Sequence, residues 1–231
     1  MSQKIDGYTL NEYYSGSHPL TSYPQLLASH LANRFNLNEN TELLEIGIGP
    51  GEVLLELASL GIRCSCIDQD QDALNRLSEK CRTRNLHIKM VLADAETSLS
   101  MPNCSFDIVY TKSFLEHLSN PVSFLKETRR VLKPNGRIIN LIPDWESQKD
   151  TFFDDITHIT PFSVVTARQV LKLAGFQNIE CEKFRQLPIC WTRPMLNRLA
   201  NCVAPFVRPR TKNKTLRWTR ELMILATAEV D

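Results

Sequence analysis

Residues 43–51 read LLEIGIGPG, and this stretch decides the fold. An apolar run leads into three alternating glycines, Gly47, Gly49 and Gly51. A short apolar run that ends in glycine is typical of a buried strand, and residues 53–60 then carry apolar side chains at helical spacing. We therefore expect a strand, a tight turn and a helix, with the backbone of the turn very close to a ligand or to a neighbouring helix.

The same alternation of apolar runs and helical patterns continues along the chain. Its expected strands are TELLEIGI, RCSCID, HIKMVLAD, FDIVYTK, RIINLI, FQNIECEKF and ELMILATAEV. Strands that alternate with helices predict an α/β fold with a mostly parallel sheet and helices on both faces. Ligands of such sheets bind beyond the carboxyl ends of the strands.

Capping signals mark three of the expected helix starts. Asp70 precedes one helix as its N-cap, and Asn120 precedes Pro121, which suits the first position of another. Thr166 and Gln169 have the spacing of a capping box, so we expect a further helix to begin there.

Length and composition indicate an ordinary globular protein. The 231 residues suit one generous domain, 42% of them are hydrophobic, and the net charge of +1 gives no polyelectrolyte character. The first 20 residues lack the apolar core of a signal peptide, and no apolar run has the length of a membrane span. The seven cysteines include no C-x-x-C pair, so we expect reduced thiols in a cytoplasmic protein.

The spacing of the glycines limits what they can hold. The dinucleotide fingerprint G-x-G-x-x-G would need a third glycine at position 52, where Glu52 stands. Its carboxylate would also oppose a pyrophosphate at the start of the helix. A Walker A loop is excluded because no Gly-Lys-Ser/Thr follows. A nucleoside ligand and a purely structural turn stay open at this point.

Two further carboxylates follow expected strands. Asp68, in CIDQD, ends the second strand about 20 residues after the glycines, where a carboxylate can accept both hydroxyls of a ribose. The alternative role, capping the next helix, falls to Asp70. Asp94, in VLADAE, follows the third strand, and taken alone it is most simply a loop aspartate.

The E-x-G-x-G-x-G spacing resembles motif I of the class I S-adenosylmethionine (SAM)-dependent methyltransferases. Residues 105–136, SFDIVYTKSFLEHLSNPVSFLKETRRVLKPNG, resemble the Phe-Asp, EHL and R-x-L-K-P-G-G block of small-molecule methyltransferases, including those of ubiquinone biosynthesis. Asn135 replaces the first paired glycine, and asparagine tolerates a left-handed turn. The THITPFS segment resembles methyltransferases of polysaccharide clusters more loosely. The main resemblance covers residues 42–140 and implies a Rossmann-like, seven-stranded sheet with an antiparallel last strand.

The resemblance also implies SAM as the cofactor and assigns contacts to it. Glu45 would face the ammonium and sulfonium side of SAM, and Asp68 the ribose. Asp94 would receive the adenine amino group, and the main chain of Ala95 would meet a ring nitrogen. The full set of expected cofactor contacts is Glu45, Gly47, Gly49, Gly51, Asp68, Gln69, Asp94, Ala95 and Thr111.

Methyl transfer from SAM requires alignment of the acceptor and exclusion of water, and a base only when the acceptor holds its proton tightly. His117, after the fourth strand, and His158, after the fifth, are the candidate catalytic bases. Each could instead pack beside the cofactor or order its loop. Asp144, Asp154 and Asp155 gather in the same region, but they do not match the ligand pattern of catechol-type methyltransferases, so we expect no metal.

We expect residues 1–40 to form an N-terminal helical cap segment and residues 41–231 the SAM-binding domain, with a basic substrate-side insertion at about 185–218. From Lys183 to Arg220 the chain has ten basic residues and no acidic one. Such a run suits a solvated face, an anionic acceptor or peripheral contact with a membrane.

Together these features predict an enzyme that transfers a methyl group from SAM to a small molecule, at an oxygen of a sugar-, lipid- or phosphate-bearing metabolite. An RNA or protein methyltransferase and a non-catalytic SAM-binding partner are the alternatives. The fourth strand leads into YTKS rather than N-P-P-Y, and few aromatic residues interleave with the basic ones, so nucleic acid is not favoured. The sequence leaves the oligomeric state open.

Overall fold

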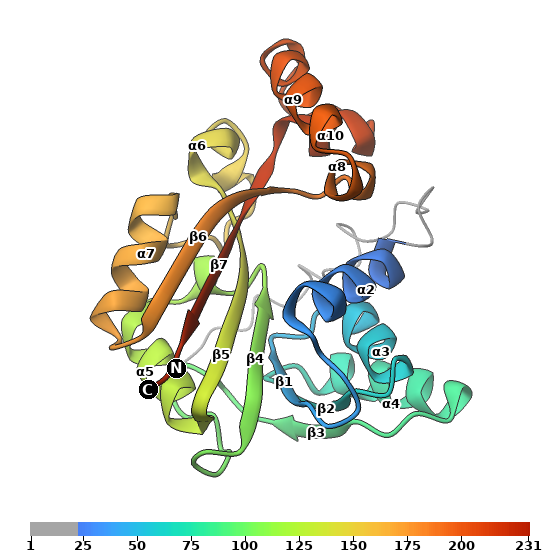
Figure 1. Ribbon diagram of the computed structural model, residues 1–231, viewed down its shortest axis with the longest axis vertical. Helices are drawn as coiled ribbons and strands as arrows, with labels where there is room; N and C mark the ends of the chain where they lie inside the picture. Colours follow the sequence, from blue (N-terminus) through green and yellow to red (C-terminus); the bar gives the residue numbers. More distant parts are fainter. Residues whose placement is uncertain (1–22) are drawn as a thin grey trace.

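The computed structural model describes residues 23–231, so much of the predicted 1–40 cap segment lies outside the described residues. One seven-stranded sheet runs through the molecule in the order β3-β2-β1-β4-β5-β7-β6 (Figure 1). Only β7 is antiparallel to its neighbours β5 and β6, and the remaining pairs are parallel. The predicted α/β class, the seven strands and the antiparallel last strand are confirmed.

Six strands agree with the apolar runs of the sequence, whereas β5 begins at Leu132, five residues before the predicted RIINLI. The strand bounds are Glu42–Ile46 for β1, Arg63–Asp68 for β2, Lys89–Leu92 for β3, Phe106–Lys112 for β4, Leu132–Pro143 for β5, Gln177–Arg185 for β6 and Leu222–Glu229 for β7. Asn135, inside β5, has a φ of 61°, so the left-handed backbone expected there is confirmed.

Helices and 3-10 turns connect the strands. The long helices are α2 (Tyr23–Phe35), α3 (Glu52–Ser59), α4 (Gln71–Arg84), α5 (Pro121–Val131), α7 (Val164–Leu173) and α9 (Pro194–Val203). The shorter elements are η1 (Leu115–His117), α6 (Trp145–Gln148), η2 (Phe152–Asp154), α8 (Pro188–Thr192), η3 (Ala204–Phe206) and α10 (Lys214–Arg220). No helix within residues 23–231 is long and apolar enough to cross a membrane.

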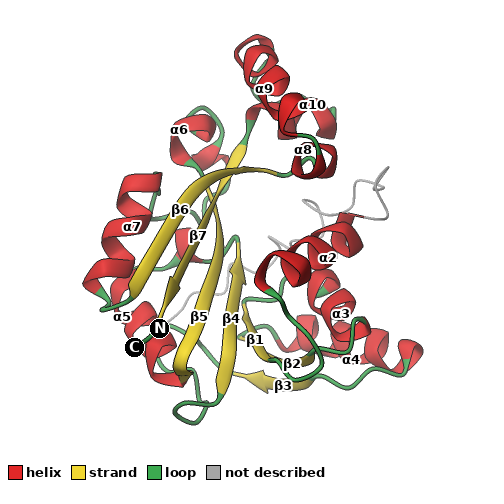
Figure 2. Ribbon diagram, viewed as in Figure 1, coloured by secondary structure: helices red, strands yellow, loops and turns green. Residues whose placement is uncertain are grey.

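Helices cover both faces of the sheet (Figure 2), and the strand side chains alternate between two cores, one on each face. Leu43 joins the core beneath α2, α3 and α4, whereas the next residue, Leu44, joins the core beneath α5 and α7. The helices between β6 and β7 add Cys190, Ala200 and Trp218 to the first core. This two-faced burial explains why the strands read as almost continuous apolar runs.

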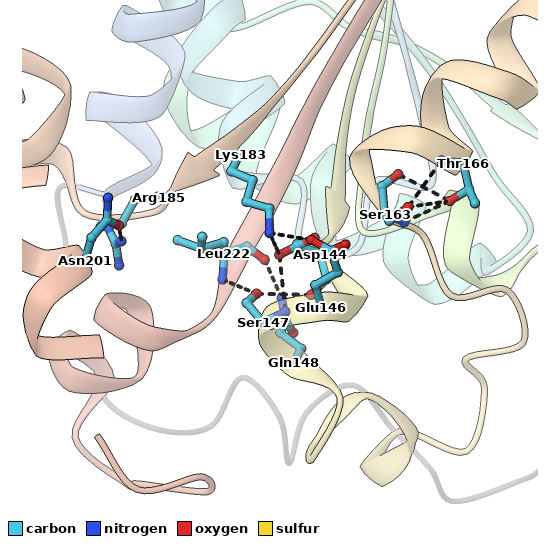
Figure 3. A network of polar contacts seen from close by, with 10 residues as sticks. All are labelled: Asp144, Glu146, Ser147, Gln148, Ser163, Thr166, Lys183, Arg185, Asn201 and Leu222. Carbon is cyan, nitrogen blue, oxygen red and sulfur yellow. Dashed lines mark hydrogen bonds and ion pairs between the residues drawn. The ribbon is translucent and has the colours of Figure 1, made fainter. Parts of the chain in front are cut away.

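Two of the three expected helix starts are confirmed, and one is wrong. Asp70 accepts a hydrogen bond from the backbone of Asp72, and Asn120 caps α5 ahead of Pro121. Helix α7 begins at Val164, before the expected start, because Ser163 and Thr166 form the capping box (Figure 3). Both residues are good caps, so the pattern alone favoured the wrong one.

The segment between β6 and β7 is anchored by a buried arginine. The Arg185 guanidinium donates to the amide oxygen of Asn201 on α9 (Figure 3). It also donates to the amide oxygen of Asn197 on α9, 2.8 Å away, and to the carbonyl of Thr219 on α10. One residue of the basic run is therefore a structural tie and is not available to an external anion.

The glycine turn is close-packed. Gly47, Gly49 and Gly51 all have positive φ, at 73°, 52° and 69°. A Cβ on Gly47 would lie 2.3 Å from the Phe114 ring, and one on Gly51 would lie 2.8 Å from Leu77. At these two positions the backbone approaches the protein's own side chains.

We expect Gly47→Ala to destabilise the protein more than Gly61→Ala. Gly61 also has positive φ, at 88°, but its nearest neighbouring atom would be 3.9 Å from an added Cβ. Each substitution incurs the left-handed penalty of about 1–2 kcal/mol, and only Gly47→Ala adds a collision with Phe114. Urea unfolding of both variants measures this difference, and equal losses would show that the Phe114 contact is unimportant.

Candidate active site at the carboxyl ends of the strands

The expected cofactor residues lie at one edge of the sheet, around the point where the strand order reverses between β1 and β4. Glu45 and the glycine turn lie at the end of β1, Asp68 ends β2, and Asp94 follows β3. Because these strands are parallel neighbours, their carboxyl ends bring the three carboxylates to the same edge.

Asp68 fastens the glycine turn to the next helix. Its Oδ2 accepts from the backbone N–H of Ile48 at 2.9 Å, and its Oδ1 accepts from the N–H of Asp70 at 2.9 Å. Burial raises the pKa of this carboxyl, and these backbone donors counteract the rise. A carboxylate oxygen with one such bond can accept another, so Asp68 fits the ribose role while it holds the loop.

Glu45 is a buried acid that lacks a complete set of partners. Its side chain is 4% exposed, and Oε2 has no hydrogen bond within the described part of the chain. Burial raises its pKa to about 8, Lys112 counteracts the rise, and Asp68 adds to it. A buried carboxyl of this kind fits the cationic side of SAM, because a positive charge beside it would stabilise the ionised form.

Asp94, Ala95 and Gln69, the residues expected to contact adenosine and ribose, follow β3 and β2 at this edge. Asp94 is exposed, and its Oδ1 accepts from the backbone of Glu96 at 2.9 Å while its carbonyl accepts from Thr97. Ala95 is 8% exposed and Gln69 is exposed. The Asp94 turn therefore presents its second carboxylate oxygen at the surface.

The side chain of Thr111 is hydrogen-bonded to another residue of the protein. It is fully buried, and its hydroxyl donates to Asn140 Oδ1 at 2.7 Å, which joins β4 to β5. The predicted cofactor contact of Thr111 therefore rests on its main chain. Sequence reasoning missed Lys112, the next residue, whose charge acts on both Glu45 and Glu116.

The two candidate bases meet although 40 residues separate them. The ring centroids of His117, in η1, and His158, in the loop after η2, are 4.9 Å apart. The backbone N–H groups of Ile159 and Thr160 both donate to the Glu116 carbonyl, at 2.8 and 2.9 Å, and hold the two segments together.

Both imidazoles are oriented by backbone carbonyls. His117 Nδ1 lies 3.2 Å from the Thr157 carbonyl, and His158 Nδ1 lies 2.6 Å from the Phe152 carbonyl. Burial, with a contribution from His158, lowers the pKa of His117, so this ring is neutral at physiological pH. A neutral imidazole can accept the proton of a hydroxyl.

Glu116 is the residue of this group that sequence reasoning missed. It is fully buried, and neither carboxylate oxygen has a hydrogen bond within the described residues. Burial raises its pKa to about 8, and Lys112 counteracts the rise. The signal was present in the EHL tripeptide, where the acid precedes His117.

The three aspartates considered for a metal each have a different partner. Asp144 caps α6 and pairs with Lys183 at 3.3 Å (Figure 3), and Asp154 pairs with Arg210 at 2.7 Å. Asp155 alone belongs to the histidine pair, with Oδ2 3.8 Å from His158 Nε2.

Comparison with known proteins identifies the fold and the domain. A family model described as a methyltransferase domain matches residues 44–140. A SAM-dependent methyltransferase structure from Archaeoglobus fulgidus superimposes with a TM-score of 0.64 at 19% identity, covering 95% of this chain and 97% of that one.

Two curated relatives match over shorter stretches. Sterol 4-C-methyltransferase strm-1 of Caenorhabditis elegans is 28% identical over 64% of this chain, and a ubiquinone biosynthesis O-methyltransferase of Caulobacter vibrioides is 32% identical over 42% of it. This chain spans 42% and 39% of those relatives' lengths. Residues 44–140 therefore match a methyltransferase domain, and this match agrees with the resemblance to the class I SAM-dependent methyltransferases that rests on the glycine turn and the three carboxylates.

Proposed function

We propose that this chain transfers the methyl group of SAM to a hydroxyl oxygen of a small, lipid-bearing molecule. The observation that carries the proposal is the convergence of a glycine turn, Glu45, Asp68 and a neutral histidine at one edge of the sheet. The first three are the groups that a cationic nucleoside requires, and the histidine suits a protic acceptor.

Each residue at the edge has a separate task in this proposal. Asp68 binds the ribose while it keeps the glycine turn in place, and Asp94 with the main chain of Ala95 binds the adenine. Glu45 balances the positive charge of the ligand in a buried position. When bound, SAM supplies a methyl group that needs no further activation. The protein's remaining work is to align the acceptor and to exclude water.

A hydroxyl acceptor must lose its proton, and the histidine pair supports this role. Phe114, at the start of the segment that carries His117, packs on Gly47, so this segment lies directly against the glycine turn. His117 is 31% exposed at its side chain and His158 is 14% exposed, so an acceptor can reach the pair only at a partly covered surface.

The insertion between β6 and β7 supports a lipid as the acceptor. A row of exposed apolar side chains follows its outer side at helical spacing: Met195, Leu199, Val203 and Phe206, which are 81%, 60%, 41% and 87% exposed. The exposed cations on the same insertion are Arg193, Arg198, Arg208, Lys212 and Arg210, the last of which pairs with Asp154. Apolar residues flanked by cations suit the interface of an anionic membrane.

The names of the two relatives agree with this choice. One is named for a sterol and the other for ubiquinone, and both are lipids. Three further cations near the insertion are paired with acids of the same chain: Lys183, Arg210 and Arg220 pair with Asp144, Asp154 and Asp150. A long polyanion such as RNA would therefore find fewer available cations than the sequence suggests.

The proposed cofactor site is tested by titrating the protein calorimetrically with SAM. We expect Asp68→Ala to weaken SAM binding at least tenfold, because the ribose loses its acceptor and the turn loses its tie to Ile48. Asp70→Ala is the matched control, since it removes the cap of α4 and the ion pair with Arg76 but leaves the Asp68 side chain in place. Binding that is equally strong in wild type and Asp68→Ala would remove the basis of the proposal.

We expect SAM binding at pH 7 to release a proton from Glu45. Its pKa of about 8 keeps it largely protonated without ligand, and a cation beside it lowers that pKa and drives ionisation. The binding enthalpy, measured in buffers with different ionisation enthalpies, reports the proton count. Glu45→Gln should lower the count by up to one proton, and an unchanged count would place the ligand's charge elsewhere.

We expect the protein to sediment with anionic phosphatidylglycerol vesicles and not with phosphatidylcholine vesicles. The double variant Met195→Glu, Phe206→Glu should lose this binding, because it places acids on the apolar row. Leu173→Glu is the control, since Leu173 is 68% exposed on α7 at the other face of the sheet. Equal sedimentation of the double variant and wild type would exclude this surface.

A further inference from the structure

Glu116 is a buried acid for which the fold provides no donor. It is fully buried, and both of its carboxylate oxygens lack a hydrogen bond within residues 23–231. Two imidazole nitrogens point at it, with His117 Nε2 3.9 Å and His158 Nε2 4.0 Å from its Oε1. Burying a carboxylate without a hydrogen-bond or charge partner destabilises the folded state. A positive ion between these atoms would remove that destabilisation.

The hydrogen bonds of the two rings fix which nitrogen is protonated. A carbonyl only accepts, so His158 Nδ1 must carry the hydrogen that it donates to Phe152. The Thr157 hydroxyl donates to Asp155 at 2.6 Å, so it and the Thr157 carbonyl can only accept from His117 Nδ1. Whenever either ring is uncharged, its Nε2 therefore carries the lone pair, and this is the nitrogen that lies 3.9–4.0 Å from Glu116 Oε1.

This arrangement matches the surroundings of metal-binding histidines. Such histidines usually donate the second ring N–H to a backbone carbonyl or a carboxylate, which fixes the ring and the tautomer. Here both rings make that contact, and the loop that carries His158 is pinned to the Glu116 carbonyl by Ile159 and Thr160. The ligand set would thus be held in place before an ion arrives.

The distances are close to those of a coordination sphere. One ligand atom from each of the three residues lies within 4.8 Å of the others. A zinc ion bound at about 2.0–2.2 Å would need its ligand atoms roughly 3.3 Å apart, so small side-chain rotations suffice. Asp155 Oδ2, 3.8 Å from His158 Nε2, adds a further acceptor, whereas Lys112 adds an opposing positive charge.

We propose that Glu116, His117 and His158 form a binding site for a divalent first-row transition metal ion, with zinc as the first candidate. Two imidazoles and one carboxylate suit zinc, manganese, iron(II) or cobalt better than magnesium or calcium, which favour sites made of oxygen ligands. Three protein ligands leave at least one coordination position for another molecule.

The role of the ion rests on the proposed function, whereas its binding does not. An acceptor hydroxyl in the open position would bind the ion through oxygen and lose its proton to water more readily. The oxygen–methyl bond then forms as the sulfur–methyl bond breaks, and the released proton passes to solvent. With the ion bound, His117 and His158 serve as its ligands, and the ion takes over the role of the base that His117 fills without it.

The test uses the full chain, freed of any affinity tag and treated with a chelator. We expect cobalt(II) to bind at one ion per chain with the visible absorption of a low-symmetry site, and zinc to displace it. Glu116→Gln, His117→Gln and His158→Gln should each weaken cobalt binding at least tenfold. His87→Gln is the matched control, because His87 is an exposed histidine outside the group. Magnesium should not compete.

Two outcomes would overturn the proposal: no stoichiometric cobalt binding by wild type, or equal binding by Glu116→Gln and wild type. Glu116→Gln is nearly isosteric and replaces an unpartnered buried acid with a neutral amide, so it should fold, as thermal unfolding will verify. SAM titration of the chelated protein separates the two proposals. Retained SAM binding without metal binding would refute the metal site alone.

Discussion

The hydrogen bond from the backbone N–H of Ile48 to the Asp68 carboxylate is the contact on which this edge of the molecule depends. It joins the turn after β1 to the end of β2. Without this hydrogen bond, the loops that follow these two parallel strands would not be connected here. The left-handed backbone at Gly47 lets the turn bend, and its missing Cβ admits the Phe114 ring. Phe114 leads into η1, so the segment that carries Glu116 and His117 is positioned from the same turn.

The edge also carries ionisable groups that the fold does not neutralise. Glu45 and Glu116 are both buried, both contain unpartnered oxygen, and burial raises both pKa values to about 8. Lys112 is the cation common to the two, and burial lowers its own pKa. Unpaired buried acids reduce stability, and such groups are concentrated where a protein binds or transforms ligands. Glu45 lies in β1 just before the glycine turn, and Glu116 lies in η1, directly after Phe114 and Leu115. At both positions a bound ligand could supply the missing positive charge.

The sequence predicted the structure correctly where the residue types within a segment are enough to determine its secondary structure. The bounds of β2 and β4 agree with RCSCID and FDIVYTK, because an apolar run buried on both faces has little freedom of placement. The start of α7 was wrong because Ser163 and Thr166 are equally good caps, and the choice between them depends on the chain that precedes them. Glu116 and Lys112 were missed because burial without a partner is a property of the packed molecule, and no spacing encodes it.

For the basic segment, too, the sequence does not show which charges are paired in the folded protein. As a sequence it is a run of cations without acids, yet Lys183, Arg210 and Arg220 find acids in the segment from Asp144 to Asp154. Each exposed pair is weak alone, but together they join the insertion to the segment that leads into His158. Arg185 fixes the other side of the insertion to β6. Helix α9 and the histidine loop are therefore two ends of one connected surface. If α9 binds a membrane as proposed, that contact would act on the histidine loop through ion pairs that salt weakens.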